Sequence, residues 1–167
     1  MQGHNNTYEE RNKNKDGTPK PNGAEIAFEA LAEKQEHWAF ERWGFDEKKA
    51  KLPTEEFIKI PEILRSFPDY LLVDHRKERS YLIEVKAFKD VFKLKINDLE
   101  NYNKWREIID HRIGFGFFVY DYKKKKHSFI DMNTVNELVK TGKLKIGKYD
   151  DNNQEYYEVP LTHGQPI

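Results

Sequence analysis

The sequence of 167 residues contains no cysteine. This absence excludes a disulfide scaffold, a thiolate zinc site and a cysteine nucleophile. The chain also lacks any run approaching the roughly 20 apolar residues of a membrane-spanning helix, and residues 1–15 show no apolar core of a secretory signal. We therefore expect a cytoplasmic protein without a membrane segment. No GxxxxGK[ST] phosphate-binding loop occurs, so an ATP-driven step would need a partner.

Charge is balanced overall but unevenly distributed. Charged residues make up 35% of the chain and hydrophobic residues 37%, while aromatic residues at 14% supply material for a core. The formal net charge is zero, yet residues 24–74 carry a net −5 and residues 75–126 a net +6. Such an asymmetry is typical of some nucleic-acid surfaces, although chance segregation of solvated charges gives the same pattern.

The order of expected elements predicts an α/β (α+β) fold with helices covering a mixed sheet. The polar residues 1–23 predict a flexible N-terminal arm, and residues 24–167 a single domain. Strong helix formers at near-helical spacing predict one helix over residues 24–43. Two strand-like runs at 69–74 and 81–88, joined by a short polar segment, predict a hairpin. Further elements are predicted at 57–60 (strand), 62–67 (helical turn or loop), 95–112 (helix), 114–122 and 127–132 (strands), 133–143 (helix), and 143–147 and 155–161 (terminal strands).

The hairpin carries the most informative residues. Asp69 follows Pro68 at the start of its first strand, and Glu84 and Lys86 lie in its second. Because alternate side chains share one face of a strand, Glu84 and Lys86 point the same way. A suitable register would place Asp69 near Glu84. Charged side chains are almost never fully buried without partners, so their presence in apolar strands indicates a site.

Two carboxylates and one ammonium at the end of a sheet suit a hard divalent cation. Mg²⁺ prefers oxygen ligands and uses one or two carboxylates together with waters. A metal-bound water has a lowered pKa and attacks phosphorus. Lys86 would orient that water, deprotonate it or stabilise the developing charge, and the sequence leaves this choice open. The alternative is a solvated surface pair of Glu84 and Lys86 in a small interaction protein.

The segment PDYLLVDHRKERSYLIEVKAF resembles the PD-(D/E)XK phosphodiesterase superfamily, which includes restriction endonucleases, Holliday junction resolvases and RecB-type nucleases. Pro68, Asp69, Glu84 and Lys86 match its P-D…E-x-K motif. The resemblance covers roughly residues 23–135, including the aromatic-bearing LENYNKW and the paired strands after it. It implies a restriction-endonuclease-like αβββαβ core. It also implies Mg²⁺ or Mn²⁺ held by Asp69 and Glu84, with the Val85 carbonyl as a third ligand.

The same resemblance implies that Lys86 positions the water or stabilises charge, and that the first helix adds a glutamate. Glu25, Glu29 and Glu33 are the candidates, since their spacing of four places them on roughly one helix face. Glu29 is the choice because it lies in the middle of the helix. Glu33 is the alternative, because its distance to Gly44 resembles the spacing in resolvases. At least two of these three glutamates are expected to form a solvated acidic stripe on the helix surface, with no role in the site.

These features predict a metal-dependent deoxyribonuclease that hydrolyses DNA phosphodiester bonds. Lys89, Lys93 and Lys95 follow the motif strand and are candidates for phosphate contacts. A chain of this length has little room for a separate recognition domain. We therefore expect a structure-selective or weakly sequence-specific endonuclease, similar to Holliday junction resolvases, and a resolvase would act as a homodimer. The alternative is a catalytically inactive or partner-dependent nucleic-acid-binding subunit on the same fold.

Overall fold

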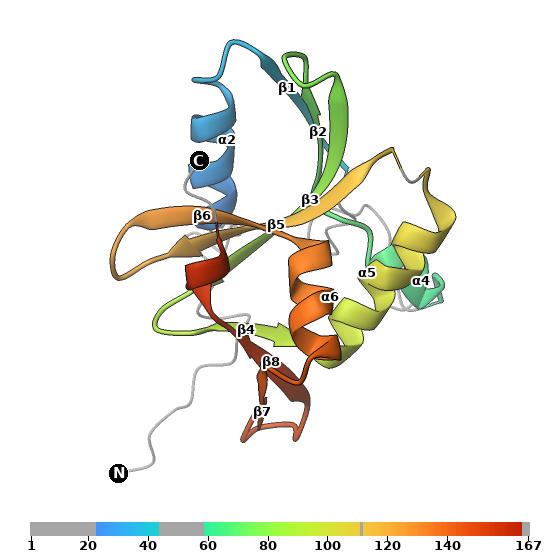
Figure 1. Ribbon diagram of the computed structural model, residues 1–167, viewed down its shortest axis with the longest axis vertical. Coiled ribbons are helices and arrows are strands. Elements are labelled where there is room, and N and C mark those ends of the chain that lie inside the picture. Colours follow the sequence, from blue (N-terminus) through green and yellow to red (C-terminus); the bar gives the residue numbers. More distant parts are fainter. Residues whose placement is uncertain (1–22, 44–58, 111, 165–167) are drawn as a thin grey trace.

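The computed structural model describes residues 23–43, 59–110 and 112–164. Its elements run in the order α2 (Gly23–Ala32), β1 (Trp38–Arg42), α4 (Glu62–Arg65), β2 (Tyr70–Asp74), β3 (Arg79–Phe88), β4 (Phe92–Lys95), α5 (Ile96–Ile108), β5 (Gly114–Asp121), β6 (Lys126–Asp131), α6 (Met132–Lys140), β7 (Lys145–Lys148), β8 (Glu155–Val159) and η1 (Leu161–His163) (Figure 1). None of the described helices is long and apolar enough to span a bilayer. The arm predicted at residues 1–23 lies outside the described residues except for Gly23, which begins α2.

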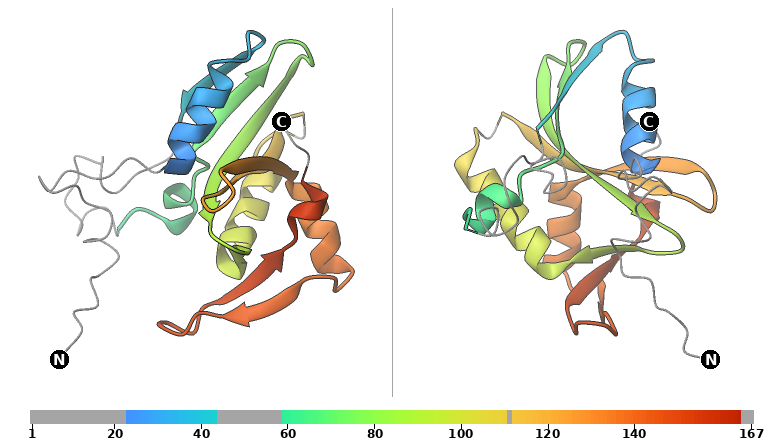
Figure 2. Two further views of the ribbon diagram at one scale, coloured as in Figure 1. Left: turned by 90° about the vertical axis from the view of Figure 1, so that its left-hand side faces the viewer. Right: turned by 180° about the vertical axis from the view of Figure 1, so that it is seen from behind.

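A five-stranded mixed sheet with the order β1-β2-β3-β5-β6 forms the centre of the structure. The only parallel pair within it is β3 with β5, and the chain crosses between these two strands through β4 and α5. Helix α2 covers one face of the sheet, while α5 and α6 lie on the other (Figure 2). A second sheet, with the order β4-β8-β7, lies at one end of the molecule. The series α2-β1-β2-β3-α5-β5 confirms the predicted αβββαβ core.

Both faces of β3 are buried, which determines where its polar side chains lie. Ile83 and Val85 belong to the apolar cluster under α2, where Phe28 is the central helical side chain. Leu82, on the opposite face, belongs to the larger cluster beneath α5 and α6. Because side chains alternate along a strand, Glu84 shares the α5 side with Leu82. Its carboxylate therefore lies beside a buried apolar layer.

The prediction of one helix over residues 24–43 was wrong in its second half. Helix α2 ends at Ala32, and β1 begins six residues later at Trp38. In β1, Trp38 and Phe40 pack against the α2 cluster, whereas the intervening Ala39 is exposed. This period of two matches a half-buried strand, and antiparallel pairing with β2 outweighs the local helix propensity.

The remaining elements largely follow their predictions. The hairpin β2-β3, helix α5, the pair β5-β6 and helix α6 lie where they were expected, and β7 and β8 pair as terminal strands. The strand predicted at 57–60 is not confirmed: Lys59 and Ile60 form a turn, and residues 57–58 lie outside the described ranges. Strand β4 was not predicted: no element was expected at its first three residues, and its last, Lys95, was expected to begin the helix over 95–112.

Candidate active site

Asp69 lies at the junction of three strands. Its backbone carbonyl accepts a hydrogen bond of 2.8 Å from the Trp43 amide, and its Oδ2 accepts one of 2.8 Å from the Val85 amide. The register pairs Tyr70 with Ile83, so Asp69, one residue earlier, lies across from Glu84. The predicted proximity of Asp69 to the motif strand is therefore confirmed, and the Val85 amide holds one oxygen of the carboxylate in place.

Glu84 and Lys86 share one face of β3, as expected, and form an ion pair. Lys86 Nζ lies 2.8 Å from Glu84 Oε1 and 3.6 Å from Asp98 Oδ2 in the first turn of α5. It also lies 5.9 Å from the centroid of the Tyr102 ring. Glu84 is only 7% exposed, which contradicts the alternative of a solvated surface pair. Buried charges of this kind need compensating partners, and Lys86 supplies the positive one.

The Asp69 and Glu84 carboxylates repel each other, and Lys86 offsets only part of this repulsion. Burial, followed by the neighbouring Glu84 carboxylate, raises the pKa of Asp69 to about 8, and the Val85 amide and Lys86 oppose that rise. Burial alone would lower the pKa of Lys86, but Glu84, Tyr102 and Asp98 outweigh it and hold that pKa well above its ordinary value. Lys86 is therefore held as an ammonium.

The donor set fits a small divalent cation that keeps several waters. No group of three His, Cys, Asp or Glu side chains within residues 23–43, 59–110 and 112–164 forms a metal cage. Asp69 and Glu84 supply two carboxylates, which is the number that Mg²⁺ commonly takes from a protein. The Val85 carbonyl lies on the same side of β3 as its amide, because a strand residue directs both groups to one neighbour. Asp69, Glu84 and the Val85 carbonyl are therefore the groups that could hold a divalent cation.

The three candidate glutamates of the first helix have different surroundings. Glu25 accepts a hydrogen bond from the Arg42 guanidinium, and its charge contributes to the raised pKa of Asp69. Glu29 Oε1 accepts a hydrogen bond of 2.6 Å from the Tyr70 hydroxyl and lies 3.7 Å from Arg42. Glu33 follows the end of α2 and is exposed. Among the three, the Glu25 charge makes a minor contribution to the raised pKa of Asp69, whereas the expected Glu29 is hydrogen-bonded to Tyr70.

The lysines beyond the motif strand lie on and beside β4. Lys89 and Lys93 are exposed and line a cavity of about 540 Å³. Lys93 Nζ lies 4.4 Å from the centroid of the Tyr156 ring, and Lys95 ends β4 immediately before α5. Sequence reasoning missed Asp98 and Tyr102 as partners of Lys86. The one signal that pointed to Asp98 was its position in the first turn of the predicted helix.

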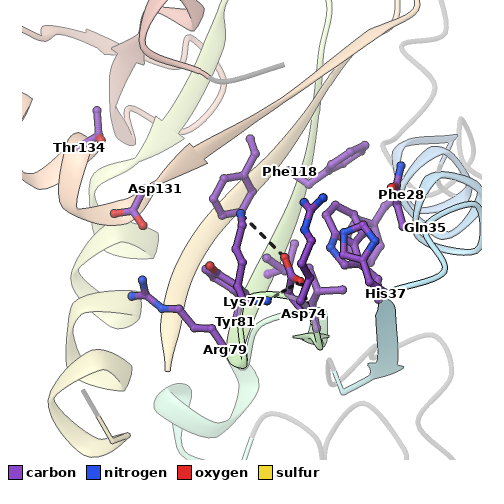
Figure 3. A pocket seen from close by; sticks show the side chains of 15 residues that line it. Phe28, Gln35, His37, Asp74, Lys77, Arg79, Tyr81, Phe118, Asp131 and Thr134 are labelled. Atoms are coloured by element: carbon purple, nitrogen blue, oxygen red, sulfur yellow. Dashed lines mark hydrogen bonds and ion pairs between the residues drawn. The ribbon is translucent and has the colours of Figure 1, made fainter. Parts of the chain in front are cut away.

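A second cavity, of about 490 Å³, lies at the turn end of the hairpin on the α2 side of the sheet (Figure 3). Its wall includes Phe28, Tyr81 and Phe118, and Asp74 lies at its edge. Asp74 Oδ1 accepts hydrogen bonds of 3.0 and 3.1 Å from the amides of Arg76 and Lys77. Because Tyr81 and Glu84 are on opposite faces of β3, this cavity is separate from the candidate site.

No family model and no curated protein matches the sequence. Among solved structures, the chain is similar to Hjc of Archaeoglobus fulgidus, a Holliday junction resolvase from an archaeal hyperthermophile. The two share 11% sequence identity over 87% of this chain and 89% of Hjc, with a TM-score of 0.51. D212, a nuclease from a fusselovirus, matches 59% of this chain and 61% of its own at 16% identity and a TM-score of 0.40. The likeness to Hjc shows that the two chains share a fold, which agrees with the restriction-endonuclease-like core that the motif predicted.

Proposed function

We propose that this protein is a metal-dependent deoxyribonuclease that hydrolyses DNA phosphodiester bonds. The observation that carries the proposal is the convergence of Asp69, Glu84 and Lys86, with Asp69 Oδ2 fixed at 2.8 Å from the Val85 amide and Lys86 Nζ 2.8 Å from Glu84. The fold supports it, because the same architecture in Hjc belongs to a Holliday junction resolvase.

Asp69, Glu84 and the Val85 carbonyl would hold Mg²⁺ or Mn²⁺. The bound ion supplies a water of lowered pKa and offsets charge on the phosphate. The chain itself provides the orientation: the Val85 amide fixes Asp69, and Lys86 sits beside Glu84 with an ammonium available to a phosphate oxygen. Placing a fixed positive group where negative charge develops stabilises a transition state.

The substrate class that we favour is branched DNA, cleaved by a structure-selective endonuclease acting as a homodimer. Support comes from the likeness to Hjc along 89% of that chain. Lys89, Lys93 and Lys95 are placed beyond Lys86, where they would contact phosphates flanking the cleaved bond. Phosphate contacts of this kind carry no sequence information, which fits a structure-selective enzyme.

The test is a substrate panel of supercoiled plasmid, linear duplex, single strand, flap and four-way junction, each incubated with Mg²⁺ or Mn²⁺. We expect cleavage that EDTA abolishes and that is strongest on branched DNA. Glu84→Gln and Lys86→Met should each reduce the rate by at least about 100-fold. Lys148→Ala, on strand β7 and ion-paired with Glu155, is the matched control and should cleave like the native protein.

Two outcomes would contradict the proposal. The first is cleavage that persists in EDTA, and the second is a Glu84→Gln or Lys86→Met variant that keeps the native rate. Thermal unfolding of each variant distinguishes lost chemistry from lost structure. Calorimetric titration with Mn²⁺ adds a reading that is independent of turnover, since Glu84→Gln should bind the ion more weakly.

A further inference from the structure

The small sheet has one face in the core and one face turned away from it. Phe92, Leu94, Tyr157 and Val159 belong to the main apolar cluster. Residues directly opposite each other in antiparallel strands share a face, so the pairs Lys93–Glu158, Lys95–Tyr156 and Lys145–Glu158 define the other face. We name this second surface, comprising Lys93, Lys95, Lys145, Tyr156 and Glu158, the outer face. Its three lysines outnumber its single acid.

Two tyrosine rings, tilted at 56° to each other, and a lysine form a compact group on the outer face. The rings of Tyr149 and Tyr156 lie with centroids 4.6 Å apart. Lys93 Nζ lies 4.4 Å from the Tyr156 centroid and 5.4 Å from that of Tyr149. Tyr156 is buried, whereas Tyr149 is half-buried. Tyr149 is therefore the more accessible of the two tyrosines.

Gly147 makes this arrangement of the rings possible. It lies opposite Tyr156 in the β7-β8 pair, and a Cβ at this position would come within 2.5–2.6 Å of the Tyr156 ring. Any side chain at residue 147 would push the Tyr156 ring away from the strand. The backbone of β7 is thus built to let Tyr156 lie across it and support Tyr149.

The outer face adjoins the candidate active site. Lys95, the last residue of β4, directly precedes α5, and Asp98 in the first turn of α5 is 3.6 Å from Lys86 Nζ. The charges of Asp98 and Lys86 act on the Tyr149 hydroxyl, whose pKa burial raises. The cavity of about 540 Å³ lies beside the outer face, where Lys93, Tyr149 and Glu158 line it together with Ala87 at the end of β3.

We propose that the outer face binds an unpaired strand of DNA next to the cleaved bond. The ring of Tyr149 stacks on one base, and Lys93, Lys95 and Lys145 contact the phosphates of the same strand. The inference rests on the proposed nuclease function and deepens it, since it names a substrate with a single-stranded segment beside the scissile phosphate. An intact duplex keeps its bases stacked on one another, so it would meet only the lysines.

The test measures binding in EDTA, by fluorescence anisotropy, of a labelled oligothymidine strand and of a labelled duplex. Tyr149→Ala should weaken single-strand binding by about ten-fold and leave duplex binding within about two-fold. Tyr149→Phe keeps the ring and should bind the single strand like the native protein. Thermal unfolding of Tyr149→Ala reports whether the small sheet remains folded.

Lys145 and Lys148 on β7 provide a matched pair of variants. This second test holds even where a tyrosine variant fails to fold. Lys145→Ala removes an exposed charge from the outer face and should reduce the slope of log Kd against log salt for the single strand by about 0.7. Lys148, which pairs with Glu155 on the opposite face, should leave that slope unchanged when replaced by Ala.

The proposal is overturned if folded Tyr149→Ala binds the single strand within two-fold of the native protein, or if it loses duplex affinity equally. Equal slopes for Lys145→Ala and Lys148→Ala would also overturn it. Because no cleavage occurs in EDTA, these outcomes are separate from the nuclease proposal, which stands or fails on Glu84→Gln and Lys86→Met. If Tyr149→Ala loses strand binding but the native protein cleaves no DNA, the outer face is a DNA-binding surface without a nuclease site beside it.

Discussion

The Asp69 carboxylate accepts a hydrogen bond of 2.8 Å from the amide of Val85, the residue between Glu84 and Lys86. This bond joins the residue before β2 to the motif strand. The β2-β3 ladder begins at Tyr70, so β2 provides no backbone acceptor for the Val85 amide. The amide that would otherwise be left unpaired is used to orient a carboxylate. One local feature thus satisfies a backbone donor and fixes a candidate metal ligand.

The two glutamates of α2 provide a matched pair of variants for the nuclease proposal. We predict that Glu25→Gln lowers the pKa of Asp69 and moves the rise of single-turnover cleavage with pH to lower pH, because the Glu25 charge contributes to the raised pKa of Asp69. Glu29→Gln should leave this pH profile unchanged, since Glu29 is bonded to Tyr70 and its amide replacement still accepts that bond. A large loss of rate in Glu29→Gln alone would restore Glu29 as the helix residue that completes the site. Urea unfolding of both variants controls for the loss of partners of Arg42.

Tyr70 packs beneath α2, and its replacement tests how much this contact stabilises the fold. Its side chain is fully buried and its hydroxyl donates to Glu29 Oε1 at 2.6 Å. Tyr70→Phe should lower the free energy of unfolding by about 1 kcal/mol, as expected for one hydrogen bond to a partly exposed carboxylate. Urea denaturation checks the value. An unchanged midpoint would mean that water replaces the bond at no cost.

Asp74 gives the fold a defined dependence on pH. Burial acts to raise the pKa of Asp74, but the Lys77 amide, together with smaller contributions from Trp38, the Arg76 amide and His37, outweighs it, so that the pKa lies below the ordinary value of 3.8. The ionised form is therefore favoured in the folded state. Its stabilising contribution is complete above pH 3.8 and is lost as the pH falls through the lowered pKa.

Replacing Asp74 by Ala should accordingly destabilise the protein by about 1–3 kcal/mol at pH 7, where it leaves two amides without their acceptor. The difference between native and variant should shrink as the pH is lowered below 3.8. Urea unfolding at a series of pH values measures both effects. A difference that stays constant from pH 7 to below that value would show that the charge of Asp74 is not involved.

How much of the site was predictable depends on the range of the interactions involved. The proximity of Asp69 to Glu84 follows from rules of strand alternation and hairpin pairing, which act over a few residues and are visible in the sequence. The rotation of α2 about its axis is set by packing of Phe28 against Tyr70 and Phe118. Sequence spacing therefore placed three glutamates on one side of a helix but did not distinguish Glu25 from Glu29.

The same distinction explains the errors in the fold. Residues Trp38–Arg42 contain good helix formers and become a strand only because β2 offers them an edge for pairing. The contact of Lys86 with Asp98 joins β3 to α5, and the position of α5 is set by its apolar residues in the core. Neither interaction leaves a local pattern that a propensity or a period would detect.

Our main proposal is that Asp69 and Glu84 hold a divalent ion that the protein needs to hydrolyse DNA. The most direct measurement is the single-turnover rate of four-way-junction cleavage as a function of Mn²⁺ concentration, for the native protein, Asp69→Asn and Glu84→Gln. We expect a saturable rise for the native protein and rates at least about 100-fold lower for both variants at every concentration. A rate that does not depend on Mn²⁺, or that is equal in all three proteins, would contradict it.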